Sequence, residues 1–344
     1  MAKSAAHAEG NRLPGVPPAI RKALLIWAQK HLKGTPTHSR PVAVALSGGA
    51  DSMALLLAVR AAWPGGVIAL HVNHGLQAAA KGFSDFCAAA CQKSQVPLRL
   101  LAVDVSQAPG VSVEAEARQA RYAALASAAE ACGAMAVLLG QHADDQAETV
   151  FLALTRGAGM PGLAAMGECS LKHGALFGRP FLRLRAVALK QWLISAGVPF
   201  VEDPSNQDQR FTRNRIRLGV MPVVTRHFPA MVDTLTRTAR HAGEAAELLK
   251  ELARSDLQAV GTPPRLDGLR ELSLRRQANV LRYWLQEVAG WPPSTAQLDE
   301  LLSQIENCCT RGHGIAIKVS AGWVHRRGPV LDYVSEKGSS LVHN

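Results

Sequence analysis

The sequence predicts an α/β protein with a doubly wound, mostly parallel sheet and a smaller, mainly helical C-terminal domain. Three observations predict this fold. Apolar runs of strand length alternate with helix-like stretches over residues 41–140, which is typical of a parallel sheet covered by helices on both faces. After about residue 180 successive helical stretches replace the strand-like runs. The chain of 344 residues is 48% hydrophobic, enough for one large and one smaller core.

Four parts are expected along the chain. They are an N-terminal extension with a lead-in helix (1–39), an α/β domain (40–225), a helical accessory domain that ends in a small hairpin (226–335), and a disordered tail (336–344). The expected strands are 41–46, 66–72, 96–103 and 134–140. The expected helices are 51–63, 82–94, 114–132, 181–196, 212–225, 229–256 and 271–306, and the last one can break at GWPP (290–293).

The first expected strand, PVAVAL (41–46), leads directly into the turn SGGADS (47–52) and then into a helix. Asp51 and Ser52 stand at the helix start, where their side chains can cap free amides. A strand, a glycine turn and a helix in this order aim backbone N–H groups and a positive helix dipole at one point, which suits phosphate. An ordinary glycine turn before a capped helix is the alternative. The turn lacks the lysine of a GxxxxGK[ST] loop.

Two further groups of polar residues follow the second and third expected strands. HVNHGL (71–76) contains His71, Asn73 and His74, but H-x-x-H without cysteine or carboxylate partners is weak support for zinc. The helix after the third strand spaces Glu114, Arg118, Arg121 and Tyr122 by three and four residues, so part of this set shares one face. A salt-bridged surface would give the same spacing.

Acidic residues crowd the helix that follows the fourth expected strand. His142, Asp144, Asp145 and Glu148 come directly after Gly140, and the carboxylates converge because they are three or four residues apart. Three close acids are unfavourable unless a cation lies among them. Mg²⁺ and the ammonium group of an amino acid are the two candidate cations.

The net charge of +11 is uneven, because residues 179–240 contain eleven Lys/Arg and four Asp/Glu. A basic segment favours a polyanionic partner such as nucleic acid, since each neutralised phosphate releases a counterion. A solvated basic surface is the alternative. The aromatic content of 5% argues against a broad base-stacking platform for single strands.

Cysteine usage and hydropathy indicate the compartment. Six scattered cysteines fit free thiols better than a disulfide framework. No run approaches eighteen apolar residues, and the first residues lack the apolar core of a signal peptide. We therefore expect a cytoplasmic protein with no membrane partner. The sequence leaves the oligomeric state open, a homodimer included.

The SGGADS turn resembles the loop of the PP-loop ATP pyrophosphatases, Rossmann-like enzymes that split ATP into AMP and pyrophosphate and adenylate a substrate. Within this group the chain resembles the tRNA(Ile)-lysidine synthetases. The motifs run in order over about residues 40–225: SGGADS, HVNHGL, E-A-x-x-x-A-R-Y, G-x-H-x-D-D-Q-A-E-T with RGAG, RPFL, and EDPSN with F-x-R-N-x-x-R. Gln77 and Gln141 depart from the family, which usually has Arg and His there, and the C-terminal part resembles the first accessory domain only.

The resemblance implies a reaction. Residues 40–225 would adenylate the C2 carbonyl oxygen of the wobble cytidine in the CAU anticodon of an isoleucine tRNA, using ATP and Mg²⁺. The ε-amine of free L-lysine would then displace AMP and form lysidine. Adenylation comes first because a pyrimidine carbonyl oxygen is a poor leaving group.

The resemblance also assigns roles to residues. ATP would be bound by Ser47, Gly48, Gly49, Ala50, Asp51, Ser52, His71, Asn73 and His74. Asp51 and Asp144 would bind the metal, and Asp145 and Glu148 would bind lysine. The catalytic set would be Asp51, Asp145, Glu148, Arg118 and His142. The tRNA would contact Arg179, Arg213, Asn214, Arg215 and Arg217.

A tRNA 2-thiolation enzyme of the same fold is the main alternative function. Such enzymes generally use paired cysteines, yet the chain has no C-x-x-C, and Cys87 with Cys91 fits the packed face of a helix. An inactive PP-loop protein that only binds tRNA is a second alternative. It would be expected to have lost Asp51 or the acidic cluster, and both are present.

Overall fold

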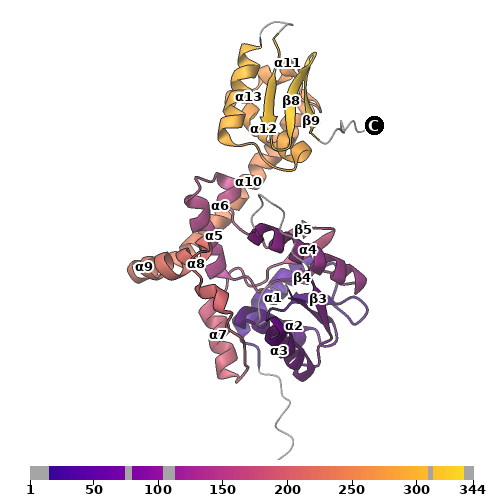
Figure 1. Cartoon of the computed structure of the whole chain (residues 1–344), viewed down its shortest axis with the longest axis vertical. Helices are drawn as coiled ribbons and strands as arrows, with labels where there is room; N and C mark the ends of the chain where they lie inside the picture. Colours follow the sequence, from indigo (N-terminus) through magenta and orange to yellow (C-terminus); the bar gives the residue numbers. More distant parts are fainter. Residues whose placement is uncertain (1–14, 74–79, 104–112, 309–312, 337–344) are drawn as a thin grey trace, which may run out of the picture. The chain divides into compact units, whose positions relative to one another are not determined.

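The structure is a computed structural model that describes residues 15–73, 80–103, 113–308 and 313–336 (Figure 1). His74, Gln77, the start of the expected N-terminal extension and nearly all of the expected tail lie outside these residues. The chain forms two compact units, Met1–Gly243 and Glu244–Asn344. We describe each unit by itself.

The first unit is built on a six-stranded sheet with the strand order β3-β2-β1-β4-β6-β5. Neighbouring strands pair in parallel except at β5, which is antiparallel to β6. The strands are β1 (Val42–Ala45), β2 (Val67–Asn73), β3 (Leu98–Ala102), β4 (Val137–Leu138), β5 (Cys169–Lys172) and β6 (Ala175–Gly178). The predicted doubly wound, mostly parallel α/β fold is confirmed.

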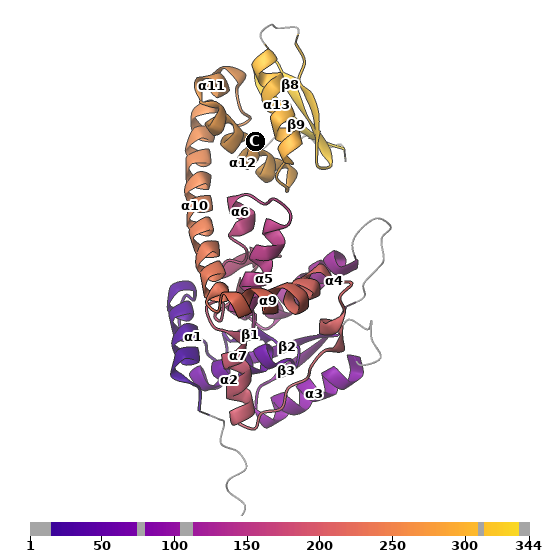
Figure 2. The ribbon, with the colours of Figure 1, turned by 90° about the vertical axis from the view of Figure 1, so that its left-hand side faces the viewer.

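Helices cover both faces of this sheet (Figure 2). One face carries α1 (Pro18–His31), α2 (Ala50–Ala62), α3 (Ala80–Lys93) and α7 (Ala186–Ser195). Their core includes the fully buried Leu24, Leu55 and Leu193. The other face carries α4 (Val113–Ala131), whose Tyr122 packs edge-on against Phe177 of β6. Because α4 returns the chain across β1, β2 and β4 flank β1 on opposite sides.

The first unit has further helical elements, several of which pack around a separate core that includes Ala147, Ile216 and Val232. They are α5 (Ala143–Leu154), α6 (Met160–Leu163), a 3₁₀ turn (η1, Pro204–Gln207), α8 (Thr212–Arg215), a π-helical turn (η2, Ile216–Val220), α9 (Met221–His227) and α10 (Met231–Val260), the last of which continues into the second unit.

The helix predicted over 181–196 is shorter in the structure and begins at Ala186. The residues before it form a turn in which Phe181 and Leu182 are buried and Leu184 donates to the Phe181 carbonyl. Asp144 then accepts the Ala186 N–H at 2.8 Å. A carboxylate from a distant element therefore caps α7, and this contact could not be anticipated from the local sequence.

The second unit contains α11 (Leu266–Glu271), α12 (Leu274–Ala289), α13 (Thr295–Asn307) and the antiparallel strands β7 (Ala316–Val319), β8 (Gly322–Arg327) and β9 (Val330–Ser335). Gly290 ends α12 with a φ of 76°, so the expected break occurs just before Trp291. The expected hairpin is a three-stranded sheet, because turns at Ser320 and Gly328 both reverse the chain. No helix in the described part of the chain is long and apolar enough to span a membrane.

Candidate active site

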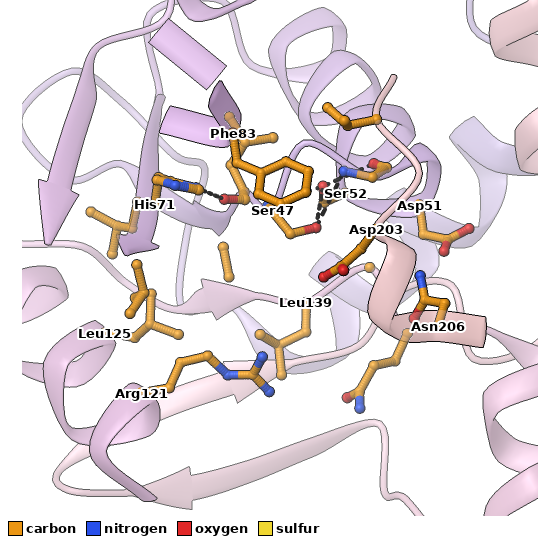
Figure 3. A pocket seen from close by; sticks show the side chains of 18 of the residues that line it. Ser47, Asp51, Ser52, His71, Phe83, Arg121, Leu125, Leu139, Asp203 and Asn206 are labelled. Carbon is orange, nitrogen blue, oxygen red and sulfur yellow. Dashed lines mark hydrogen bonds between the residues drawn. The ribbon is translucent and has the colours of Figure 1, made fainter. Parts of the chain in front are cut away.

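A cavity of about 640 Å³ opens at the carboxyl ends of β1, β2 and β4 (Figure 3). The strand order reverses at this place, with β2 on one side of β1 and β4 on the other. Open α/β sheets bind ligands at such switch points. Further walls come from α4 and from the turn at residues 201–206.

The 47–52 turn forms one side of this cavity and has a well-defined internal geometry. Gly48 has a φ of +87°, and a Cβ there would lie 3.2 Å from Phe86 and Val201. The Ser52 hydroxyl accepts the Ser47 N–H at 3.2 Å and donates to the Gly49 carbonyl at 3.0 Å. The turn is therefore held by its own hydrogen bonds, and α2 starts at Ala50 with its free amides at the cavity.

A glycine joins this turn to the acidic cluster. A Cβ at Gly140, just after β4, would lie 2.8 Å from the carbonyl carbon and oxygen of Asp51 and 3.0 Å from the Ser52 nitrogen. These are backbone atoms that cannot rotate away. A side chain at this position would therefore force β4 and the start of α2 apart.

His71 lies buried at the edge of the cavity, and its hydrogen bonds define its tautomer. Its Nδ1 lies 2.8 Å from the Leu46 carbonyl, which can only accept, so Nδ1 carries the proton. Its Nε2 then accepts from the Ser84 hydroxyl at 3.1 Å. Both ring nitrogens are engaged within the protein. The nucleotide contact predicted for His71 stays a prediction, and Asn73 also lines the cavity.

His142 connects the phosphate-binding turn to the acids of α5. Its Nε2 lies 3.4 Å from both Asp51 Oδ2 and Asp145 Oδ2, and its Nδ1 accepts the Asp145 N–H at 3.3 Å. Burial opposes the charge, but the hydrogen bond to Asp51 and the charges of Asp145, Asp51 and Asp144 raise the pKa of His142 to about 9. Protonation at Nδ1 would end the bond from Asp145, so the charged ring and this cap exclude each other.

Two arginines of the 212–217 segment neutralise the acids of α5 in the structure, in place of the Mg²⁺ or ammonium group that the sequence suggested. Glu148, whose side chain is 4% exposed, accepts from Arg213 Nε at 2.8 Å and from Arg217 Nε at 2.6 Å. Asp145 Oδ1 accepts from the same guanidinium groups at 3.0 and 3.2 Å. Burial opposes the charge of Arg217, but Glu148 outweighs it and raises the pKa of this arginine. The residues predicted to bind lysine thus contact residues predicted to bind tRNA.

Asp144, the predicted second metal ligand, turns toward α7. Its carboxylate accepts from Arg185 at 3.2 Å in addition to the Ala186 N–H. Within the described residues, no group of three or more His, Cys, Asp or Glu side chains is arranged to hold a metal ion. The metal role of Asp144 stays a prediction, and it would require the pair with Arg185 to open.

Other predicted residues lie inside the protein. The buried Arg179 donates to Gln141 at 2.5 Å and to the Gly167 carbonyl at 3.0 Å. The buried Asn214 donates to the carbonyls of Ser205 and Asp208 at 2.8 and 2.9 Å. Both side chains stabilise turns around the cavity, and their tRNA contacts stay predictions.

Two exposed arginines differ in what surrounds them. Arg215 donates to Thr212 at 2.9 Å and has no acidic partner among the described residues. Arg118 lies over the Tyr122 ring at 5.3 Å and does not line the cavity, whereas Arg121 does. Arg215 is therefore available to a phosphate, and the catalytic role of Arg118 stays a prediction.

Sequence reasoning did not single out several cavity residues. Phe83, Asp203 and Asn206 project toward the cavity in Figure 3, as does Arg121, which the helical spacing of 114–122 had already singled out. Asp203 and Asn206 belong to EDPSN, which supported the family resemblance but whose residues were given no part in binding or catalysis. The sequence does not show where this segment lies in the fold. In the structure Val201 donates to the Gly48 carbonyl at 2.9 Å, so the segment lies against the phosphate-binding turn.

Comparison with known proteins identifies the family of this chain. The PP-loop domain family matches residues 24–224, and the TilS substrate binding domain matches residues 265–327. A tRNA(Ile)-lysidine synthase of Polaromonas naphthalenivorans is 51% identical over 295 residues, which are 86% of this chain and 90% of that protein. The chain belongs to the tRNA(Ile)-lysidine synthase family.

Other members of the tRNA(Ile)-lysidine synthase family are longer than this chain. The proteins from Burkholderia pseudomallei and Pseudomonas aeruginosa are 41% and 43% identical, and the matches cover 82% and 73% of this chain but only 59% and 60% of those proteins. Among solved structures, the U34-tRNA thiolase NcsA from Methanococcus maripaludis aligns with a TM-score of 0.54 at 16% identity, over 64% of this chain and 78% of that one. This likeness concerns the fold alone.

Proposed function

We propose that the chain is the ligase that converts the wobble cytidine of an isoleucine tRNA with a CAU anticodon into lysidine. ATP would adenylate the C2 carbonyl oxygen with release of pyrophosphate, and the lysine ε-amine would then displace AMP. The observation that carries the proposal is a cavity lined both by the SGGADS turn and by Asp145, whose carboxylate shares the guanidinium groups of Arg213 and Arg217 with the buried Glu148. Family membership supports the same reaction.

The phosphates of ATP would lie against the 47–52 turn. The amides of the turn and of the first turn of α2 donate toward this position, and the Ser47 and Ser52 hydroxyls lie 3.1 Å apart beside it. The apolar wall with Leu70 and Leu125 offers a surface for the base. The reaction splits the α,β-phosphate bond, so the α-phosphate must face the incoming cytidine.

A magnesium ion would neutralise the phosphates and the pyrophosphate that leaves. Asp51 fits as a ligand, because its side chain is 39% exposed, lines the cavity and, among the ionisable groups of the described residues, contacts only the His142 ring. Oxygen atoms of the ATP phosphates would supply further ligands to the magnesium ion. The His142 Nε2 lies 3.4 Å from the Asp51 carboxylate, so we assign His142 a positioning role.

Asp145 and Glu148 would bind an ammonium group of free lysine, and Arg215 would contact tRNA phosphate. The arginines now paired with the acids would have to shift when lysine enters, because all Glu148 oxygens accept from guanidinium groups. The π-helical turn beside them, Ile216–Val220, is a feature that often marks functional sites.

The test is incubation of the protein with ATP, total tRNA and one radiolabelled amino acid at a time. We expect label from lysine alone to enter tRNA, and only tRNA with a CAU anticodon. Transfer of sulfur in place of lysine would favour the 2-thiolation alternative. Binding of tRNA without any ATP turnover would favour an inactive tRNA-binding protein.

A further inference from the structure

The cavity contains one acid whose charge has no counterpart. Three acids line it: Asp51, Asp145 and Asp203. Asp51 contacts His142, and Asp145 contacts Arg213 and Arg217. No basic side chain among the described residues pairs with Asp203, whose carboxylate accepts the Ser205 N–H at 2.8 Å.

Asp203 is nevertheless held firmly in place. It caps the 3₁₀ turn η1, and the buried Asn214 holds that turn from behind through the Ser205 and Asp208 carbonyls. On the other side, Val201 is bound to Gly48 of the phosphate-binding turn at 2.9 Å. Figure 3 shows the Asp203 carboxylate pointing into the cavity, and its Oδ1 is the oxygen that accepts the Ser205 N–H.

A carboxylate beside a phosphate-binding turn is unfavourable when ATP binds, because both groups are anions. A cation must therefore enter with or after ATP. Lysine brings two ammonium groups, whereas the Asp145/Glu148 pair is already balanced by two guanidinium groups. Asp203 is thus the acid of the cavity that is free to neutralise a second positive charge.

We propose that Asp203 binds the side-chain ammonium group of the incoming lysine and so selects lysine over amino acids with neutral side chains. This inference rests on the proposed function. We assign the side-chain end of lysine to Asp203 because the lysine ε-amine must reach the cytidine carbonyl that is joined to the α-phosphate. The hydrogen bond from Val201 to Gly48 places Asp203 beside the turn that would hold these phosphates. The α-amino group is then left for Asp145 and Glu148.

The test compares the wild type with Asp203→Asn, which keeps an oxygen for the Ser205 N–H and removes only the charge. The KM for lysine should rise roughly tenfold or more, since a charged hydrogen bond is lost. Pyrophosphate release from ATP and tRNA without lysine should stay within about twofold. Asp203→Glu should recover part of the lysine affinity, and Asp208→Asn, whose carboxylate pairs with the exposed Arg210, should match the wild type.

Two lysine analogues identify the end that Asp203 contacts. Inhibition by 6-aminohexanoate, which keeps the side-chain amine, should weaken about tenfold in Asp203→Asn, in line with the loss of a charged hydrogen bond. Inhibition by norleucine, which lacks that amine, should not change. Weakening of norleucine alone would assign the α-amino end and overturn the proposal.

Other outcomes separate the role of Asp203 in lysine binding from the proposed formation of lysidine. Equal loss of pyrophosphate release and lysine transfer would place Asp203 at magnesium or ATP and overturn the inference while lysidine formation stands. An unchanged KM for lysine would likewise overturn it. If the wild type transfers no lysine, the proposed function itself fails.

Discussion

The ion-pair cluster at Glu148 allows a stability prediction with a matched control. Glu148→Gln removes one charge from a group of two acids and two arginines in which the Glu148 side chain is 4% exposed. The amide can accept at one oxygen only, and its NH₂ group would face a guanidinium N–H. The substitution therefore leaves two guanidinium groups to share Asp145 as their one remaining acid in the cluster, with one positive charge in excess in a largely buried place.

The magnitude follows from burial. Removal of one partner from a buried ion pair costs roughly 3–5 kcal/mol. The Arg213 and Arg217 side chains are 31% and 34% exposed, so water screens part of their charge. We therefore expect a loss of about 2–3 kcal/mol in the free energy of unfolding of the first unit.

Glu202→Gln is the control. Glu202 pairs with Lys190 at 2.6 Å, the same distance as Arg217 to Glu148, but the Glu202 side chain is 75% exposed. This exposed pair should contribute nothing measurable. The free energy of unfolding of both variants is measured by urea denaturation, with hydrogen exchange in peptides of the first unit as the readout. Equal stability of the two variants would refute the claim that burial makes the Glu148 cluster strong.

Three further predictions concern the reaction and the backbone around it. Asp51→Ala should abolish tRNA-dependent pyrophosphate release in a folded protein, and near wild-type release would remove Asp51 from the mechanism. Arg215→Ala should weaken tRNA binding by about 1 kcal/mol and lower the salt slope by roughly one unit in titrations at several salt concentrations; an unaltered slope would show that no phosphate lies there. Gly140→Ala should destabilise the first unit by about 1–3 kcal/mol in urea and weaken ATP binding. Gly82→Ala, with open space around its Cβ, should not destabilise, and equal effects of the two would contradict the close approach at Asp51.

The sequence predicted the parts of the fold that local pattern controls. The strand, glycine turn and helix around SGGADS need only a buried β-branched run, glycines free to adopt positive φ, and helix formers. Strands β5 and β6 were missed because CSLK and ALFG have little β-branched character. Their pairing depends on the turn at His173 and Gly174, both at positive φ, and on the neighbouring β4.

The site was predictable as a set of residues but not as a set of contacts. The acids of α5 converge by helical spacing, so their need for a cation follows from sequence alone. Their partners Arg213 and Arg217 lie 65 to 72 positions away, and only the folded chain brings them together. Distance in sequence also hid the cap that Asp144 supplies to Ala186 of α7 and the contact of Val201 with Gly48, which brings the Asp203 segment to the phosphate-binding turn.

Analysis of the wobble nucleoside tests the central claim most directly. An isoleucine tRNA with a CAU anticodon is incubated with the protein, ATP and isotopically labelled lysine, then digested and examined by mass spectrometry, with AMP and pyrophosphate measured alongside. We predict one lysine-modified cytidine at the wobble position, with one AMP and one pyrophosphate for each. ATP turnover with an unmodified or sulfur-containing wobble cytidine would contradict the account.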